Sequence, residues 1–375
     1  MKIFNKNEWK KVKLGDVFNL QMGKTPLREN KLYWNKGKYN WISISDMNFS
    51  EKYLFSTKEK ISDIAIKESG IKLIPKNTVI MSFKLSIGKV KIVNEDIYSN
   101  EAIMAFIPKE NFFIDKNFLY YCLKSLKWNE GINKAVKGLT LNKNLIAQKE
   151  IFLPDLTIQK EISNNLDSIN NLLELRKNQL NYLKELNKSL FITFNENGIE
   201  KRLDDIADIT MGQSPLSQSY NLGKKGLPFY QGKTEFGDIY IKEPIIYCNS
   251  PIKIVEKNDI LMSVRAPVGD VNIATQKSCI GRGLASIRAK KIDYLYLFYL
   301  LKEQKIKIEK MGVGSTFKAI NKNNISSLQI PIIEMSKQNR IKKYLLLIEK
   351  LSFEIEKSIK EAENLYNSLM NKYFE

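Results

Sequence analysis

The stretch IMSFKLSIGKV at residues 80–90 returns later in the chain as LMSVRAPVGDV at residues 261–271. In both copies an apolar run leads into Met-Ser, a basic residue stands two positions after the serine, and a glycine follows. The apolar runs predict buried strands, and the glycine tolerates the positive φ that many turns require. Because an internal repeat constrains the whole architecture, this pair indicates a duplicated domain.

Two more pairs of motifs flank the first pair in the same order. The earlier pair is LGDV with MGKTP (14–17, 22–26) against LDDI with MGQSP (203–206, 211–215), and the later pair is GLTLNKN (138–144) against GST with INKN (314–316, 320–323). The offset drifts from 189 to 181 residues between the earlier pair and the 80–90 pair, as expected for a duplication with loop insertions. Each copy then ends on an apolar residue and a proline, Pro154 or Pro331.

The body of each repeat has a mixed pattern of strands and helices. Residues 41–45 alternate between apolar and polar side chains, which predicts a half-buried strand. The apolar runs 117–123 and 294–301 suit short buried helices, with a strand left open as the alternative.

Long helices are the clearest prediction of the sequence. After Pro154 and Pro331, apolar residues recur at spacings of three and four, without glycine or proline, as in the seam of a coiled coil. The predicted seam residues are Leu166, Ile169, Leu173, Leu180, Leu183, Leu190, Ile341, Leu345, Ile348, Ile355, Ile359 and Leu369. Roughly 35 residues make a rod of about 50 Å. The two helices are expected to pair antiparallel, the alternative being that each lies on its own domain.

The expected fold is therefore α+β, with two pseudo-repeated mixed α/β domains separated by two long antiparallel coiled-coil helices. We place the first domain at residues 1–155, the central helix at 156–199, the second domain at 200–333 and the C-terminal helix at 334–375.

Charge points to a polyanionic partner. The 375 residues carry a net charge of +19, and the excess is uneven. Residues 1–155 hold 27 basic and 16 acidic side chains, whereas residues 156–199 hold 5 of each. A lysine-rich coding bias alone does not leave one segment neutral, so we expect basic surfaces on the two domains.

Composition argues against several other classes. The charged N-terminus and the lack of a long apolar run predict neither a signal peptide nor a membrane span. Three widely spaced cysteines favour buried thiols in a reducing compartment, which suggests the cytoplasm. The chain has no histidine, no GxxxxGK[ST] loop and no Pro-Pro dipeptide, so the common catalytic, ATP-binding and amino-methyltransferase motifs are missing. We expect no catalytic or metal site and no cofactor in this chain.

DNA binding requires cations for phosphates and hydrogen-bonding side chains for base edges. The repeated motifs supply such residues at matching places. The candidate DNA contacts are Lys24, Lys84, Thr140, Lys143, Gln213, Arg265, Arg282, Ser315, Thr316, Lys318 and Lys322.

At this point the chain resembles the specificity subunits of type I restriction-modification systems. The resemblance is carried by WKKVKLGDV (9–17) with its echo KRLDDI (201–206), by the two Met-Ser segments, and by Asn323 to Pro331 followed by Gln338 and a long helix. Two departures stand at the helix starts. Pro154-Asp155 and Pro331-Ile332 replace the usual Pro-Pro, and Ile158-Gln159 and Lys337-Gln338 replace the usual Glu-Gln.

The resemblance implies two target-recognition domains, each reading half of a bipartite, asymmetric site in double-stranded DNA. It further implies assembly with two methylation subunits, which use S-adenosylmethionine to modify adenine, and with two restriction subunits, which use ATP and Mg. The alternatives are a type IIB specificity subunit, a non-catalytic scaffold for acidic proteins, and an enzyme with unrecognised motifs.

Overall fold

The computed structural model describes residues 6–34, 37–48, 51–84, 86–128, 141–195, 198–312 and 318–375. It divides into two compact units, unit 1 with Met1–Lys177 and Ser358–Glu375, and unit 2 with Asn178–Lys357. Each unit contains one repeat body and a part of each long helix, α6 (Leu156–Asn195) and α11 (Met335–Phe374).

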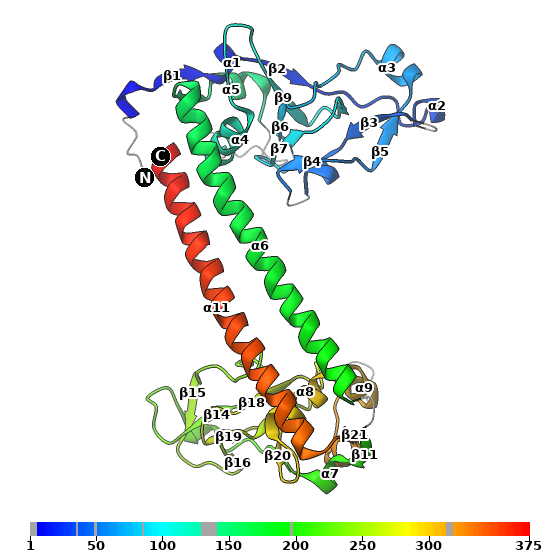
Figure 1. The fold of residues 1–375 in the computed structure, drawn as a ribbon, viewed down its shortest axis with the longest axis vertical. Helices are drawn as coiled ribbons and strands as arrows, with labels where there is room; N and C mark the ends of the chain where they lie inside the picture. Colours follow the sequence, from blue (N-terminus) through cyan, green and yellow to red (C-terminus); the bar gives the residue numbers. More distant parts are fainter. Residues whose placement is uncertain are drawn as a thin grey trace. The chain divides into compact units, whose positions relative to one another are not determined.

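A five-stranded sheet forms the core of unit 1, and the helix α4 (Lys116–Ser125) packs against two of its strands, β6 (Val79–Ser82) and β7 (Val90–Val93) (Figure 1). Its order is β2 (Phe18–Met22), β9 (Ile103–Pro108), β6 (Val79–Ser82), β7 (Val90–Val93) and β4 (Tyr53–Leu54). A second sheet consists of β5 (Glu59–Ile61), β3 (Tyr39–Ile42) and β8 (Tyr98–Ser99), and a ribbon pairs β1 (Lys10–Lys13) with β10 (Glu150–Leu153). The helices are α1 (Leu14–Val17), α2 (Lys31–Trp34), α3 (Asp63–Ser69), α4 (Lys116–Ser125) and α5 (Lys143–Gln148). Buried Ile42, Ile80 and Ile103 join the two sheets in one apolar cluster.

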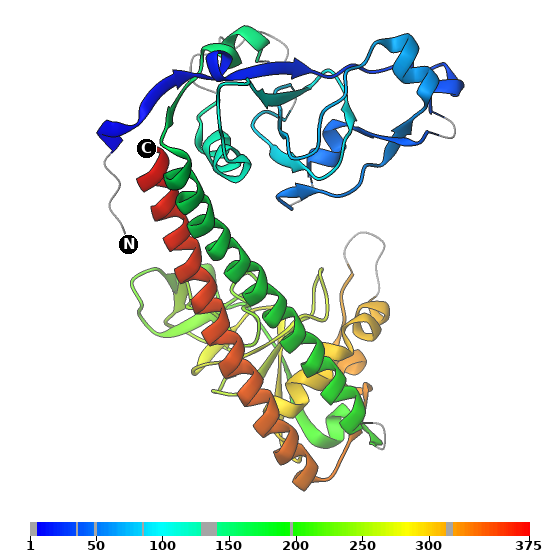
Figure 2. The same cartoon turned by 45° about the horizontal axis from the view of Figure 1, so that its top comes forward.

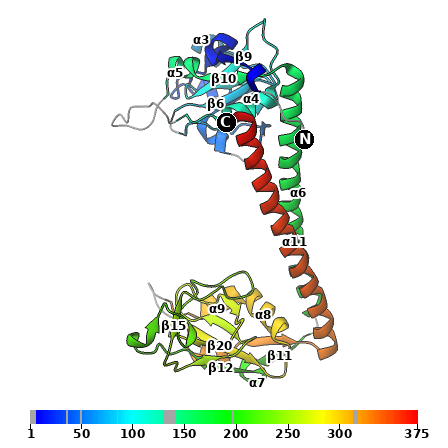
Figure 3. The ribbon, with the colours of Figure 1, turned by 90° about the vertical axis from the view of Figure 1, so that its left-hand side faces the viewer.

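Unit 2 is built in the same way around a four-stranded antiparallel sheet. Its order is β12 (Ala207–Met211), β20 (Leu284–Ala289), β17 (Ile260–Ser263) and β18 (Val271–Ile273). The second sheet has the order β13 (Tyr220–Asn221), β15 (Ile246–Cys248), β14 (Leu227–Tyr230), β19 (Ser278–Ile280) and β16 (Ile254–Val255), and the ribbon pairs β11 (Ile199–Arg202) with β21 (Gln329–Ile332). The helices are α7 (Leu203–Ile206), α8 (Tyr294–Glu303), α9 (Lys305–Met311) and α10 (Lys322–Ser326). The helix α8 packs on β18 and β20, on the side of the sheet where the long helices lie (Figures 1 and 3).

The two units share one framework, which confirms the predicted pseudo-repeat. The strands β2-β9-β6-β7 have the same order and directions as β12-β20-β17-β18. The parallel pair β3–β8 corresponds to β14–β19, and the ribbon β1–β10 to β11–β21. The strands β5 and β15 correspond as well, because they pair antiparallel with β3 and β14. What differs is the inserted material, which holds α2 and α3 in unit 1 and β13 in unit 2.

The helices α6 and α11 pack against one another in opposite directions within each unit (Figure 2). In unit 1 the Asn165 amide donates to the Tyr373 hydroxyl at 3.1 Å, so the start of α6 meets the end of α11. In unit 2 the rings of Phe194 and Tyr344 lie 6.4 Å apart, so the end of α6 meets the start of α11. The predicted antiparallel pairing is confirmed.

A buried glutamine at the start of each long helix fastens that helix to its domain body. In unit 1, Gln159 Nε2 donates to the Pro154 carbonyl at 2.9 Å, and its Oε1 accepts the N–H of Asp115, the N-cap of α4, at 2.8 Å. Gln338 accepts the N–H of Asp293, the N-cap of α8, at 3.0 Å. The glutamine that repeats in the sequence thus has a structural role in both units.

Two local predictions are refined by the structure. The strand expected at residues 41–45 ends at Ile42, because a 3₁₀ turn begins at Ile44 and the Asp46 carboxylate accepts the Ser43 N–H at 2.8 Å. The apolar runs 117–123 and 294–301 are helices, α4 and α8, each capped by an aspartate. The three cysteines are buried and free, as predicted.

Candidate nucleic-acid interface

The loops that carry the repeated motifs lie together in each unit, at one end of the strands of the main sheet. We call this side of the sheet, where strands begin and end, an edge. In unit 1 the ends of β2 and β6 and the start of β9 share this edge, because the three strands are antiparallel neighbours. The ends of β12 and β17 and the start of β20 share it in unit 2. We define edge 1 as residues 23–28, 83–84, 86–89, 100–102 and 141, and edge 2 as residues 212–217, 264–270, 281–283 and 318–320.

A buried serine holds the Met-Ser turn at each edge. Ser263 Oγ donates to the Pro267 carbonyl at 2.9 Å and accepts the Asp270 N–H at 3.0 Å, while Gly269 N–H donates to the Ser263 carbonyl. Ser82 makes the equivalent three bonds at edge 1. The glycines have the positive φ predicted for this turn, 83° at Gly88 and 87° at Gly269. The turn fixes the backbone next to Lys84 and Arg265.

A glycine brings the first loop of each edge close to the neighbouring strand. A Cβ on Gly23 would lie 2.1 Å from the Ser99 carbonyl oxygen, and one on Gly212 would lie 2.1 Å from the Gly281 carbonyl oxygen. The next residue in each loop, Lys24 or Gln213, pairs its N–H with the strand across at 2.8 and 3.1 Å. Lys24 and Gln213 therefore occupy equivalent positions.

The third repeated motif returns to the same edges. The Leu141 N–H donates to the Phe83 carbonyl at 3.2 Å, and the Ile320 N–H donates to the Val264 carbonyl at 3.0 Å. At edge 2, Arg265 forms an isolated bridge with Ala319. This contact places Lys318 beside the Met-Ser turn.

The structure brings six of the predicted DNA-contact residues to the two edges. Lys24 and Lys84 lie on edge 1, and Gln213, Arg265, Arg282 and Lys318 lie on edge 2; of these six, Lys84 is half-buried and the others are exposed. Lys143 and Lys322 are the exposed first residues of α5 and α10 and lie beside β2 and β12 rather than on the edges. Thr140, Ser315 and Thr316 lie outside the described residues.

Edge 1 also holds charged residues that the sequence patterns did not single out. The Arg28 guanidinium lies 3.9 Å from the ring centroid of Trp34 and 4.7 Å from that of Trp41, and it pairs with Glu59. A hydrogen bond from Thr25, helped by Lys84, holds the pKa of the Glu101 carboxyl below its usual value. In the sequence, the signal that could have pointed to Arg28 was its closeness to two tryptophans, Trp34 and Trp41.

The predicted seam residues occupy the inner faces of the long helices. Buried are Leu166, Leu173, Ile341, Leu345, Ile348 and Leu369; half-buried are Ile169, Leu180, Leu183, Leu190, Ile355 and Ile359. Other apolar residues of the same helices are exposed, such as Leu175 at 61% and Tyr182 at 73%.

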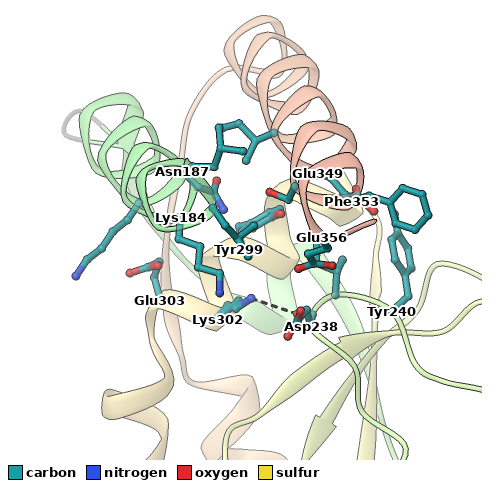
Figure 4. A pocket seen from close by; sticks show the side chains of 16 residues that line it. Lys184, Asn187, Asp238, Tyr240, Tyr299, Lys302, Glu303, Glu349, Phe353 and Glu356 are labelled. Carbon is teal, nitrogen blue, oxygen red and sulfur yellow. Dashed lines mark hydrogen bonds between the residues drawn. The ribbon is translucent and has the colours of Figure 1, made fainter. Parts of the chain in front are cut away.

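A cavity of about 630 Å³ lies in unit 2 between α6, α8 and α11 (Figure 4). Lys302 Nζ donates to the Asp238 carbonyl there at 3.2 Å, and burial raises the pKa of the Glu349 carboxyl. Its charged lining residues are Lys184, Lys188, Lys302, Asp238, Glu303, Glu349 and Glu356. Because four carboxylates face three lysines, this cavity does not favour a polyanion, and the edges remain the candidate interface.

Within the part of the chain that the structure describes, no cluster of three metal-ligating side chains is present. Among the same residues, none of the helices has the length and apolar character needed to span a bilayer.

Comparison with known proteins gives a family for the chain. The model of the type I restriction modification DNA specificity domain matches residues 6–185 and again residues 195–363. The chain belongs to the type I restriction-modification DNA specificity family. A protein described as the specificity subunit of the type I restriction enzyme MjaX of Methanocaldococcus jannaschii is 36% identical over 316 residues, which cover 76% of this chain and 74% of that protein.

Other members of the family are more distant. The EcoprrI specificity subunit of Escherichia coli is 28% identical over 236 residues, 55% of either chain. The crystal structure of a type I S subunit from M. genitalium covers 100% of this chain and 98% of its own, with a TM-score of 0.64 and 17% identity. The HsdS subunit from Thermoanaerobacter tengcongensis gives a TM-score of 0.51 at 24% identity and covers 98% of this chain and 96% of its own. These structures support the fold.

The first match to the specificity-domain family begins in a repeat body and the second at the last residue of α6, and each continues through its repeat body into the long helix that follows. The repeating element of the family is thus a body together with its helix. We call the bodies of unit 1 and unit 2 domain 1 and domain 2.

Proposed function

We propose that this chain is the DNA-reading subunit of a type I restriction-modification complex, in which edge 1 and edge 2 each read one half of a bipartite, asymmetric site. One observation carries the proposal: the same motif-bearing sheet edge, supplied with cations, occurs on both copies of a DNA specificity domain. Phosphate contacts from Lys84 and Arg265 would set the register of each domain on the duplex, and the exposed loop residues would read base edges.

The paired helices set the number of unread bases between the half-sites. Each helix has 40 residues, which at about 1.5 Å per residue gives a length of about 60 Å. The heptad spacing runs along both helices, with the polar residues Arg176, Asn187 and Ser352 at seam positions, and a supercoiled pair is stiffer than a single helix. In this proposal the gap length is a property of the helices, and the half-site sequences are properties of the loops.

Partner subunits supply the chemistry. We expect two methylation subunits, which use S-adenosylmethionine to modify adenine, and two restriction subunits, which use ATP and Mg. Apolar side chains on the outer faces of the helices support docking of protein partners there. The exposed ones include Leu172, Leu175 and Leu365 in unit 1, and Tyr182, Leu186, Leu347 and Leu351 in unit 2.

Methylation sequencing tests this proposal. The chain is co-expressed with the methylation subunit of its own system, and the DNA of the cells is sequenced for modified adenines. The expected result is one bipartite motif with a gap of constant length. An uninterrupted motif, or no motif that depends on this chain, contradicts the proposal.

A salt titration of DNA binding by the full chain gives a second readout. Because phosphate contacts release counterions, affinity is expected to fall by more than about tenfold between 50 mM and 200 mM salt. Affinity that stays flat over this range excludes a phosphate-tracking surface.

A further inference from the structure

Glu101 and Arg282 occupy the same position in the two edges. Each is the middle residue of the short turn that leads into β9 or β20. In both turns the preceding residue donates its N–H to the last residue of the parallel neighbouring strand, β3 or β14, at 3.0 and 2.9 Å. The following residue accepts the N–H of the residue after the buried serine at 2.9 Å in both edges.

The hydroxyl residues that contact these two positions also correspond. At edge 1 the Thr25 hydroxyl donates to the Glu101 carboxylate. At edge 2 the hydroxyl of Ser214, which stands at the matching place in the MGQSP motif, accepts the backbone N–H of Arg282 at 3.2 Å. Both side chains are exposed. The framework is therefore the same, while the side chain that it presents changes from an anion to a cation.

The backbone around this position is fixed, so each side chain starts from a defined place. A Cβ on Gly283 would lie 2.4 Å from the Gln231 carbonyl oxygen, which keeps the turn at edge 2 packed against the second sheet. At edge 1 the Thr25 hydrogen bond orients the carboxylate and keeps Glu101 ionised by lowering its pKa. A carboxylate held in this way, and an arginine on a fixed backbone, suit directional hydrogen bonding.

A carboxylate on an edge that binds DNA can make favourable contacts with only a few groups of the duplex. It is repelled by phosphates, so its favourable contact with a duplex is as an acceptor for an exocyclic amino group, above all cytosine N4. An arginine has the complementary preference, since its planar fork donates two hydrogen bonds to guanine O6 and N7.

We infer that the position shared by Glu101 and Arg282 is a base-reading position at which the two domains select opposite hydrogen-bonding patterns. Arg282 selects a guanine in the half-site of domain 2, and Glu101 selects a cytosine amino group in the half-site of domain 1. This inference rests on the proposed function.

The test uses two conservative variants of the full chain, each co-expressed with its methylation subunit. Glu101→Gln removes the charge but keeps the size of the side chain. Arg282→Lys keeps the charge but loses the bidentate hydrogen-bond donor. The frequency of adenine methylation at every single-base variant of the wild-type site is measured by sequencing. Affinity for a duplex without the site is measured by titration.

Glu101→Gln is expected to lower discrimination about tenfold at one base pair of the domain 1 half-site and to leave the other half-site unchanged. Arg282→Lys is expected to do the same in the domain 2 half-site, with affinity for the unrelated duplex within about twofold of wild type. Lys76→Gln and Lys257→Gln are matched controls, because these exposed lysines precede β6 and β17 at the opposite sheet edges. Neither control is expected to change either half-site.

Unchanged half-sites in both variants would overturn the inference, as would a loss spread evenly over all sequences, which marks a phosphate contact. Thermal unfolding checks that the variants fold, and Glu101→Ala and Arg282→Gln provide a second pair. If the wild-type complex reads no bipartite site, the proposed function itself fails. That result differs from one in which the wild type reads such a site and the variants read it equally well.

Discussion

Edge 1 and edge 2 share the same backbone framework, but their loops present different side chains. The buried serines, the glycines with positive φ and the close approach at Gly23 and Gly212 recur in both. Edge 1 presents Arg28 over two tryptophans, whereas unit 2 holds the stacked rings of Tyr220 and Phe229, 4.7 Å apart. A framework common to both domains, with divergent loops, is what an asymmetric site requires, because the placement on DNA is shared while the bases read are not.

The largest expected effect comes from breaking the shared framework. In Gly212→Val the new Cβ would lie 2.1 Å from the Gly281 carbonyl oxygen and 2.7 Å from that of Leu284, both backbone atoms that cannot move freely. We expect a loss of about 100-fold in affinity for the cognate site, and an equal loss for Gly23→Val at edge 1.

Gly232→Val is the matched control for this prediction, because a Cβ there meets no atom within 4 Å. Binding by this control is expected to stay within about twofold of wild type. If Gly212→Val binds as tightly as Gly232→Val, the close approach at the edge is not needed for reading DNA.

Removing one cation from each edge is expected to weaken DNA binding less than the glycine substitutions do, and by different amounts at the two edges. Arg265→Ala is expected to weaken binding about tenfold for all sequences and to reduce the salt slope by about one. Lys84→Ala is expected to cost less, because Lys84 is half-buried and Glu101 lies close enough for Lys84 to lower its pKa. Titrations at several salt concentrations measure both. A larger effect for Lys84→Ala than for Arg265→Ala would reverse the comparison of the edges.

The framework was largely predictable from the sequence, because it consists of local patterns. Heptad spacing identified the helix seam, and the Met-Ser turn kept its serine and glycine in both copies. The correspondence of Glu101 with Arg282 was hidden, since the two side chains have opposite chemistry and only their backbone hydrogen bonds reveal it. Likewise, the bond from Gln159 to the Asp115 backbone joins residues 44 positions apart, which no local pattern encodes.

The two buried glutamines allow a test of whether both units are fastened to their long helices in the same way, with the free energy of unfolding as the measure. Gln159→Leu and Gln338→Leu each leave the backbone N–H of an N-cap aspartate without its acceptor. Each variant is expected to lose about 1–3 kcal/mol in the free energy of unfolding of its own unit, measured in urea. Gln148→Leu on the exposed end of α5 is the control and is expected to be near neutral. If either core glutamine behaves like Gln148, the two units are not fastened to their helices in the same way.

The smallest expected effect concerns Glu349, in the cavity of unit 2. Burial raises the pKa of this carboxyl, so its contribution to stability is present below the usual pKa of a glutamate and is lost as pH rises through the raised value. Glu349→Gln is therefore expected to be more stable than wild type near pH 7, and the difference is expected to shrink as pH falls through the raised pKa and to be lost below about pH 4, near the usual pKa of a glutamate. Melting temperatures across this range measure it, and a difference independent of pH would count against burial as the cause.

The central claim is that the paired helices determine the separation of two independent readers. Inserting seven residues into α6 after Lys177 and seven into α11 after Lys357 keeps the heptad seam in phase and lengthens each helix by about 10 Å. Methylation sequencing of cells carrying this variant is predicted to show both half-sites unchanged and a gap longer by about three base pairs, at about 3.4 Å each. An unchanged gap, or altered half-sites, would contradict the account.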